Sequence, residues 1–308
     1  MNAFLRALPI EGKVRRRELV EKDQYIHRIL SYLQENSPLG EDLYFKGGTC
    51  LTKAHLGYFR FSEDIDFTWA HQDDWDGLST AQVKKRCSSL IDDIAVELEV
   101  LTADLGFNFL ADKVEPDQID IGSGGRMVTF NIWYFSVVTG AEEFLKVQLN
   151  FVDDIFDDVE ELPLTSFVSE ILGDEELEEL RFRFDEDIRD YTREFAFPCY
   201  SSREIYLEKC RAILTRRGIK VRDVIDIGML EARFGYTVEQ QASDIVKKTV
   251  PMLNYQRYAK NLEGRTPSLP KEYPDREMSM MIGPLPSSVL DRLPDIYSEI
   301  YSLSRNLI

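Results

Sequence analysis

The stretch FKGGTCLTKAHLGYFRFSEDIDF, residues 45–67, constrains the fold of this chain more than any other. A short apolar run ends in a Gly-Gly-Thr turn, a segment of helical character follows, and a second apolar run contains two aspartates. Asp64 and Asp66 are two positions apart, so on a strand they project from one face while Ile65 and Phe67 turn into the core. The pattern predicts a strand–turn–helix–strand unit with two carboxylates on one face.

The rest of the N-terminal half carries the helices and strands that such a unit needs. Apolar residues at helical spacing predict helices over 18–35, before the NSPLG turn, and over 80–104. RMVTFNIWYFSVV and FLKVQLNFV are rich in β-branched and aromatic residues, and the link TGAEE makes them a predicted hairpin. The helix after the glycines is expected to begin near Thr49.

Strand signals fade after about residue 165. Helical patterns cover residues 203–217, 221–235 and 238–262, and a proline-marked irregular stretch precedes a last short helix. The sequence therefore predicts an α+β chain, with a mixed sheet and flanking helices in a domain over residues 1–165 and a helical domain over residues 166–308.

Bulk composition excludes several classes of protein. The 308 residues include no run of 18 apolar residues and no secretory signal pattern at the start, so we expect a cytoplasmic protein without a membrane partner. A formal charge of −18 disfavours non-specific binding to nucleic acid or anionic lipid. The scattered cysteines and histidines predict reduced thiols and packing or surface imidazoles, not disulfides or a zinc site; they are Cys50, Cys87, Cys199, Cys210, His27, His55 and His71.

Much of the acid lies in the stretch DDIFDDVEELPLTSFVSEILGDEELEEL, residues 153–180. Charge runs are usually solvated faces of helices and loops. The alternative is a docking surface for a basic partner, and the sequence leaves both open.

The opening stretch has the composition of a phosphate and metal site. Two carboxylates on one face repel each other unless a cation lies between them, and Mg²⁺ prefers carboxylate oxygens together with substrate phosphates. Two such ions could hold the attacking and leaving oxygens of a phosphoryl displacement. Glycines allow backbone N–H groups to approach a phosphate closely. There is no GxxxxGK[ST] motif, so a P-loop NTPase is not indicated. Alone, either piece is an ordinary turn or a solvated strand end; their conjunction is what predicts a site.

These motifs resemble those of a known family. GGT followed by DID resembles the signature of the polymerase-β-like nucleotidyltransferases, and FKGGTCL with RFSEDIDF resembles the AbiEii family of nucleotidyltransferase toxins. A second block, YLEKCRAILTRR followed by KVRDVIDIGML, matches the family pattern in order and spacing. The resemblance spans residues 45–230. It implies a polymerase-β-like fold for the N-terminal domain and an active site that the helical domain completes.

The resemblance also implies roles for individual residues. Asp64 and Asp66 would bind magnesium and act in catalysis together with Lys209 and Asp223. The nucleotide would be bound by Gly47, Gly48, Thr49, Lys146, Lys209 and Asp226. The implied cofactor is Mg²⁺, as a two-ion site, and the implied substrate is an NTP.

One position departs from the family pattern. Nucleotidyltransferases of this kind usually present a third acid from a neighbouring strand, and here Gln148 stands at that place in LKVQLNF. A glutamine cannot deprotonate an attacking hydroxyl. Either the family tolerates this, or another acid such as Asp153 substitutes, or catalysis is weak. Lys146, two residues away on the same face, could contact phosphate.

The resemblance implies a toxin that transfers a nucleoside monophosphate to an acceptor, with the 3′ end of tRNA as one precedent, and a cognate antitoxin as partner. The basic residues Arg211, Arg216, Arg217, Lys220 and Arg222 are candidates for binding RNA, and KVRRR at residues 13–17 is a second candidate. Two other functions stay open: transfer to a protein or small molecule, and a catalytically degenerate fold that binds a partner.

Overall fold

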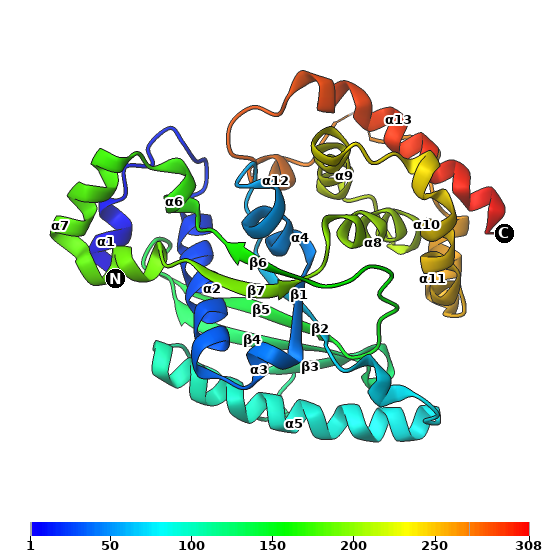
Figure 1. The fold of residues 1–308 in the computed structure, drawn as a ribbon, viewed down its shortest axis with the longest axis horizontal. Helices are drawn as coiled ribbons and strands as arrows, with labels where there is room; N and C mark the ends of the chain where they lie inside the picture. The colour runs from blue at the N-terminus through cyan, green and yellow to red at the C-terminus, as the bar shows by residue number, and fades with distance from the viewer. Residues whose placement is uncertain (1, 271, 308) are drawn as a thin grey trace. The chain divides into compact units, whose positions relative to one another are not determined.

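All seven strands of the structure belong to one mixed sheet with the order β3-β4-β5-β2-β1-β7-β6. The structure is a computed structural model and describes residues 2–270 and 272–307. The chain divides into two compact units, one of residues 1–153 and 159–200 and one of residues 154–158 and 201–308. The sheet lies wholly in the first unit, so the second unit is helical (Figure 1).

The strands are β1 (Leu43–Lys46), β2 (Asp64–Trp69), β3 (Ile119–Gly122), β4 (Met127–Phe135), β5 (Glu142–Asn150), β6 (Glu160–Leu164) and β7 (Phe195–Cys199). The first unit also contains α1 (Asn2–Ala7), α2 (Arg17–Asn36), α3 (Leu39–Asp42), α4 (Gly47–Cys50), a π-helix η1 (Leu51–Leu56), α5 (Thr80–Leu105), α6 (Phe167–Ile171) and α7 (Asp174–Tyr191). The second unit contains α8 (Ser202–Thr215), α9 (Val221–Phe234), α10 (Val238–Leu253), α11 (Gln256–Glu263), α12 (Asp275–Met278) and α13 (Ser287–Leu303). Short 3₁₀ turns lie at Gln72–Trp75, Ser123–Gly125 and Ser304–Asn306.

The elements with the strongest sequence patterns are confirmed. Helices α2 and α5 match their predicted ranges, and α5 begins at a capping box in which the Ser79 side chain accepts from Gln82 N–H. Strands β4 and β5 form the predicted antiparallel hairpin. The predicted fold class, a mixed sheet with flanking helices plus a helical part, is also confirmed.

Three predictions about elements were wrong. Strands do not end at residue 165, because β7 pairs with β1 and β6. The helix predicted over 238–262 breaks into α10 and α11, and the last helix has 17 residues and is not short. Thr49 does lie near the start of the helix after the glycines, as predicted; this helix, α4, begins at Gly47 and continues as the π-helix η1. The predicted domain boundary at residue 165 stays a prediction, although the structural division places residues 159–200 in the first unit.

One face of the sheet forms the apolar core of the first unit. Ile65 and Phe67 of β2 are 0% and 1% exposed, and Phe45, Val147 and Phe130 beside them on β1, β5 and β4 are also buried. Helix α5 packs against β4, and α2 packs against α5 and β7. Burial of this face leaves the opposite side chains of the same strands for polar groups.

The second unit includes a short piece of the strand-rich half. Residues 154–158 lie with helices α8 and α10, where Phe156 N–H donates to Glu204 at 3.0 Å and Arg203 pairs with Asp157 at 2.5 Å. Lys248 pairs with the buried Glu204 carboxylate. These contacts fix the 154–158 segment within the second unit.

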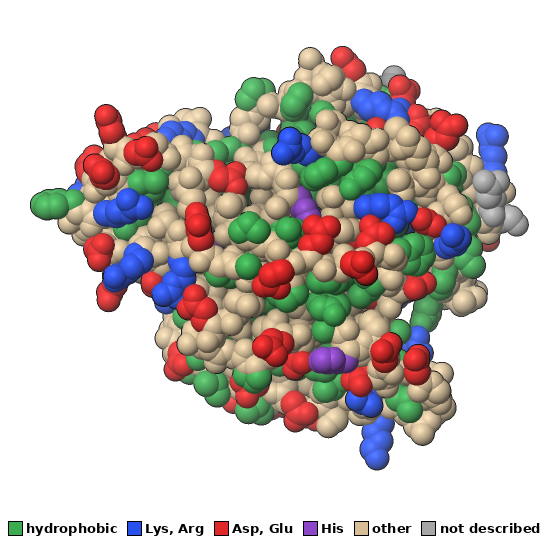
Figure 2. All heavy atoms as spheres, viewed as in Figure 1, with side chains coloured by type: hydrophobic (Ala, Val, Ile, Leu, Met, Phe, Trp, Pro, Cys, Tyr) green, Lys and Arg blue, Asp and Glu red, His purple; other side chains and the backbone are tan. Residues whose placement is uncertain are grey.

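The surface carries charge of both signs. Figure 2 shows Asp and Glu side chains spread over the visible face with Lys and Arg among them, in keeping with a formal charge of −18. No helix among the described residues is long and apolar enough to span a membrane. All four cysteines are buried free thiols, as predicted.

Candidate functional site

The polar face of the sheet collects several of the predicted site residues. Asp66 on β2 is paired in register with Lys46 on β1 and with Gln148 on β5. Gln148 is in turn paired with Thr129 on β4. Because directly opposed residues of neighbouring strands share a face, these four side chains form one row across the sheet.

A second row lies beside the first. Asp64 is paired with Lys146 on β5, which is paired with Asn131 on β4. Asp64 and Asp66 are both half-buried, so their carboxylates are reachable from solvent while Ile65 between them is fully buried. The alternation predicted for DIDF is therefore present, and a lysine lies next to each aspartate.

The glycine turn packs directly against this face. Gly47 has φ +77°, a conformation that disfavours any side chain, and a Cβ at this position would overlap Asp66 Oδ2. A Cβ on Gly48 would lie 2.7 Å from Arg60 Nη2 and 3.0 Å from Ser62 Oγ. Both glycines are thus required by close approach, one to a carboxylate and one to a guanidinium.

Thr49 ties the turn to the aspartates. Its side chain is 1% exposed, and its hydroxyl donates to the backbone carbonyl of Asp64. The hydroxyl therefore fixes the distance between α4 and β2, and the Thr49 side chain is engaged within the protein. Backbone N–H groups at the start of a helix can donate to a phosphate.

Gln148 occupies the position where a third acid was expected. Gln148 lies beside Asp66, as the alignment of LKVQLNF predicted. Asp153, the alternative acid, pairs with Lys46 at 2.7 Å and accepts from Tyr200 at 3.1 Å. Lys46 also lies 5.2 Å from the centre of the Tyr200 ring. Asp153 thus fixes Lys46 and is already bound as an ion-pair partner.

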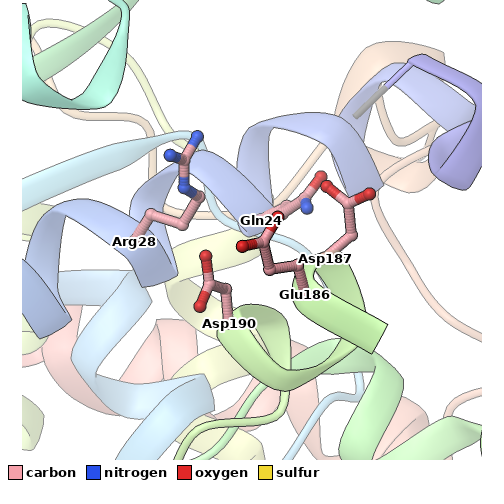
Figure 3. A pocket seen from close by; sticks show the side chains of 5 residues that line it. All are labelled: Gln24, Arg28, Glu186, Asp187 and Asp190. Carbon is pink, nitrogen blue, oxygen red and sulfur yellow. The ribbon is translucent and has the colours of Figure 1, made fainter. Parts of the chain in front are cut away.

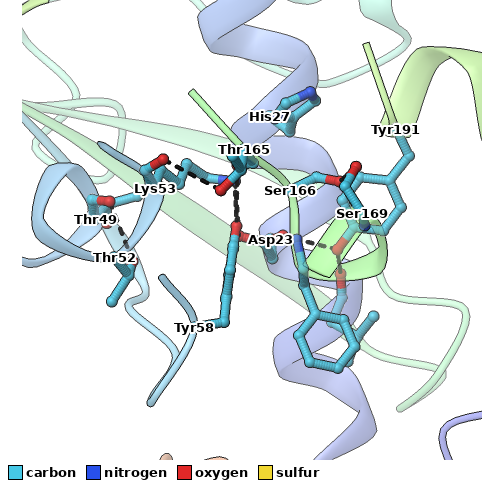
Figure 4. A network of polar contacts seen from close by, with 12 residues as sticks. Asp23, His27, Thr49, Thr52, Lys53, Tyr58, Thr165, Ser166, Ser169 and Tyr191 are labelled. Carbon is cyan, nitrogen blue, oxygen red and sulfur yellow. Dashed lines mark hydrogen bonds and ion pairs between the residues drawn. The ribbon is translucent and has the colours of Figure 1, made fainter. Parts of the chain in front are cut away.

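A buried polar network supports the turn from behind (Figure 4). Lys53 of η1 pairs with Asp23 of α2 at 2.9 Å, and Tyr58 and Tyr191 donate to the same carboxylate at 2.7 and 2.8 Å. Burial alone would raise the pKa of Asp23, but the Lys53 charge and the tyrosine hydrogen bonds hold that pKa below its usual range. Burial likewise lowers the pKa of Lys53. The network anchors the π-helix that follows the glycines.

The second unit holds its own cluster, made by α8 and α9. Lys209 pairs with Asp226 at 2.6 Å and with Asp223 at 3.4 Å, and Arg216 pairs with Asp223. Burial would raise the pKa of Asp223, and the charges of Lys209 and Arg216 more than offset this and lower it. The three predicted residues of this block therefore lie together, with Arg216 as a fourth member.

The predicted RNA-binding residues lie at the connection between α8 and α9. Arg216, Arg217 and Lys220 are exposed, whereas Arg211 is half-buried and pairs with Glu208 at 3.2 Å. The other basic stretch is largely engaged within the first unit. Lys13 and Arg16 each pair with a glutamate, and Arg17 pairs with Glu11 at 2.8 Å.

The donor set of the sheet face suits a hydrated magnesium ion. Two carboxylates lie on one strand face. The glycine at position 47 keeps the space beside Asp66 Oδ2 open, because a Cβ there would fill it. Within residues 2–270 and 272–307 no three acids, histidines or cysteines are placed to hold a metal on their own. Magnesium usually keeps waters and substrate phosphates besides one or two carboxylates, so two aspartates fit its chemistry.

Two residues of this face were missed in the sequence. Lys46 immediately precedes the glycines in FKGGT, and Arg60 begins the run RFSEDID. Arg60 is 2% exposed, donates to Phe61 O at 2.7 Å and lies over Gly48. Their positions inside the two motifs could have marked both residues as candidates. The sequence did not show which neighbours they contact.

Comparisons with known proteins bear on the family and the fold. A family model described as nucleotidyl transferase AbiEii toxin, type IV TA system, matches residues 28–295. No curated protein sequence matches the chain. The solved structure of MenT4, a nucleotidyltransferase toxin from Mycobacterium tuberculosis, has a TM-score of 0.59 at 15% identity and covers 100% of this chain and 90% of MenT4. This likeness shows a shared fold.

Two Helicobacter pylori structures align with lower scores. JHP933 has a TM-score of 0.42 at 13% identity, covering 95% of this chain and 92% of JHP933. A putative nucleotidyltransferase has a TM-score of 0.43 at 15% identity, covering 95% of this chain and 99% of its own.

Proposed function

The chain belongs to the nucleotidyl transferase AbiEii toxin family of type IV toxin–antitoxin systems, and from this premise we propose that it transfers a nucleoside monophosphate from an NTP to the 3′ end of tRNA. The observation that carries the proposal is the pair of half-buried aspartates on one strand face, with a lysine opposite each and a glycine turn against them. A nucleotidyltransferase needs these elements to hold a triphosphate and its counter-ion.

Each residue of the sheet face has a role in this proposal. Asp64 and Asp66 hold Mg²⁺, which supplies charge neutralisation to the phosphates when bound. Backbone N–H groups of Gly47 and Gly48 donate to phosphate oxygens, and Lys146 contacts the same groups as a point charge. Lys46, held by Asp153, adds a fixed positive charge beside Asp66.

The reaction is a displacement at the α-phosphorus of the NTP. The acceptor hydroxyl oxygen forms the new bond to phosphorus, the bond to the bridging oxygen breaks so that pyrophosphate leaves, and the hydroxyl proton passes to solvent water. Positioning and charge stabilisation account for most of the catalysis of such transfers. Gln148 cannot take the hydroxyl proton, so the side chains of this row contribute orientation and charge.

Residues of the second unit are proposed to be required for the same reaction. Lys209 contacts nucleotide phosphates, and Asp223 and Asp226 hold the Lys209 ammonium in place until it does so. Support comes from the shared ion-pair cluster, in which one lysine lies between two carboxylates. The proposal also includes the predicted domains, 1–165 and 166–308, as parts that are both needed for activity.

Asp64→Asn tests the proposed site. Loss of one carboxylate charge from the metal pair should reduce transfer at least about a hundredfold, which is about 2.7 kcal/mol of transition-state stabilisation. The assay is incubation with labelled NTPs and Mg²⁺ followed by measurement of label in RNA, protein and small-molecule fractions. Asp120→Asn, which changes an exposed carboxylate of β3 in the same sheet, is the matched control. Equal activity of the parent and Asp64→Asn would reject the site.

The acceptor needs a separate test, because net charge opposes RNA binding. Arg217→Glu with Lys220→Glu reverses two exposed charges and leaves the Arg216–Asp223 pair intact. We expect RNA labelling to fall at least tenfold with NTP binding nearly unchanged, since each phosphate contact contributes to salt-dependent affinity. Lys85→Glu with Arg181→Glu makes the same charge change in the first unit and should have little effect.

The fraction that carries the label distinguishes the alternatives. Label found only on protein or on a small molecule would replace tRNA by that acceptor. Absence of NTP binding in the parent protein would favour a degenerate fold that binds a partner.

A further inference from the structure

A second polar site lies in the first unit between α2 and α7. Gln24 and Arg28 of α2 and Glu186, Asp187 and Asp190 of α7 line a hollow of about 240 Å³ (Figure 3). The two helices pack against each other in the same unit. None of these five residues belongs to the proposed transfer site.

An unsatisfied acceptor lies at the floor of this hollow. Gln24 is 1% exposed, and its Oε1 has no hydrogen-bond partner among the described residues. Figure 3 shows the Gln24 amide turned toward the α7 acids. A buried acceptor without a donor costs free energy, and a carboxylate cannot relieve it because an ionised carboxylate only accepts. The floor therefore calls for a ligand that donates N–H groups.

The rim of the hollow carries a net negative charge. Three carboxylates line the hollow against one guanidinium, that of Arg28, which also lies 5.9 Å from the centre of the Phe107 ring. Helix α7 as a whole has nine acidic and three basic residues, a formal net charge of −6. Figure 2 shows acidic side chains over this part of the surface with basic ones among them. The charge favours a cationic ligand.

A guanidinium group fits the acceptors of the hollow, an amide oxygen at the floor and carboxylates at the rim. A guanidinium presents five N–H donors in a plane and can satisfy an amide oxygen and a carboxylate at the same time. The hollow is also smaller than most small-molecule pockets, which run from about 300 to 1,000 Å³, so it suits one side chain.

The surface beside the hollow favours a protein as the source of that group. Phe182 on α7 is 93% exposed, close to the backbone kink at Phe184 and four positions before Glu186. A protein contact commonly combines an aromatic anchor with a charged pocket. A free diamine would not cover the exposed Phe182 ring. The acidic stretch at residues 153–180 includes the first turns of α7. The sequence left open that this stretch is a docking surface for a basic partner, which agrees with a partner bound at α7.

We propose that the α2–α7 hollow binds an arginine side chain of a partner protein. Gln24 Oε1 accepts from the guanidinium at the floor, Glu186 and Asp190 pair with it at the rim, and Phe182 packs against an apolar side chain of the same partner. The inference is independent of the transfer reaction, because it uses no residue of that site.

The probe for the test is a fluorescein-labelled peptide of twelve residues with arginine at every third or fourth position among alanine and leucine. Binding to the full chain is followed by anisotropy. Glu186→Gln with Asp190→Asn should weaken binding at least tenfold. Glu175→Gln with Glu178→Gln removes the same charge from exposed positions of the same helix and should change binding less than threefold.

Two further comparisons separate the pocket from general charge. Gln24→Leu removes the floor acceptor without changing net charge and should weaken the arginine peptide at least threefold. A peptide with citrulline in place of arginine keeps the shape without the charge and should not bind. Circular dichroism checks the fold of Gln24→Leu. If that variant unfolds, the comparison of the two α7 double variants decides the question.

Specific outcomes would overturn the proposal. Equal loss in the two α7 double variants would reduce the effect to non-specific attraction. Saturable binding of spermidine or Mg²⁺ that is lost in the Glu186→Gln, Asp190→Asn variant, with peptide binding unchanged, would assign the hollow to a small cation instead.

Discussion

Lys53 in the first unit and Lys209 in the second are both buried against aspartates, and their surroundings differ. Lys53 has one carboxylate partner, Asp23, and its side chain is 0% exposed. Lys209 has two, Asp223 and Asp226, and its side chain is 10% exposed. Arg216 also pairs with Asp223 from the exposed end of α8, so the second cluster contains two cations and two anions.

The difference separates a structural pair from a cluster that can exchange partners. Every acceptor position around Asp23 is taken by Lys53, two tyrosine hydroxyls and the Phe167 N–H. A closed network of this kind specifies packing and has no place for a ligand. Lys209 is 10% exposed and shares its charge between two acids, and in the proposed reaction a phosphate replaces one of them.

Removal of one charge from the closed pair should have the largest effect on stability. Lys53→Met leaves Asp23 buried without its cation, which should lower the free energy of unfolding by about 3–5 kcal/mol. Urea unfolding followed by circular dichroism measures the change. Adding Asp23→Asn to this variant should recover part of the loss, because the amide is neutral. A loss under about 1 kcal/mol in Lys53→Met would mean that Asp23 does not depend on Lys53 for its charge compensation.

The same substitution in both clusters would sharpen the comparison. Lys53→Arg inserts extra volume into an enclosed site and should cost about 1–3 kcal/mol of stability. Lys209→Arg keeps the charge at a side chain that is 10% exposed, against 0% for Lys53, so the free energy of unfolding should fall less than in Lys53→Arg. Transfer activity should nevertheless fall about tenfold, because a guanidinium is not a compact point charge. Parallel urea unfolding and NTP-labelling assays give both readouts, and the reverse pattern would exchange the roles assigned to the two lysines.

Acid should weaken the first unit through a buried histidine. All three histidines lie within residues 1–153, and burial lowers the pKa of His27, beside the Asp23 network, to about 3. The unfolded chain takes up this proton below about pH 6.5 and the folded chain does not, so stability is complete above pH 6.5 and falls as pH drops toward 3.

The expected slope is about 1.4 kcal/mol per pH unit for this one group. His27→Phe keeps a ring against Tyr191 and Phe195 and should flatten the slope between pH 6 and pH 5. Urea unfolding at several pH values measures it. An unchanged slope in His27→Phe would place the acid sensitivity elsewhere, with His55, whose pKa burial also lowers, as the next candidate.

Local patterns predicted much of the fold. The ranges of α2, α5, α8 and α9 and the β4–β5 hairpin follow from apolar periodicity and turn residues. Strands β3, β6 and β7 escaped notice because each has only four or five residues and, unlike β1, precedes no Gly-Gly-Thr turn. Strand β7 is stabilised by its pairing with β1 and β6. Short strands carry little periodicity of their own.

The sequence by itself determined which residues were candidates for the site. The alternation in DIDF placed two carboxylates on one face, and the order of the GGT, DID and KVRDVID motifs indicated the family. These are properties of neighbours along the chain, where the backbone period alone decides direction.

Only the tertiary structure decided what surrounds those residues. Sheet register placed Lys46 and Gln148 beside Asp66, and packing buried the Thr49 hydroxyl against Asp64 O. Asp23 and Lys53 are thirty positions apart and pair because η1 and α2 meet in the core. Such contacts depend on the burial of whole faces and on strand register, which no local pattern contains.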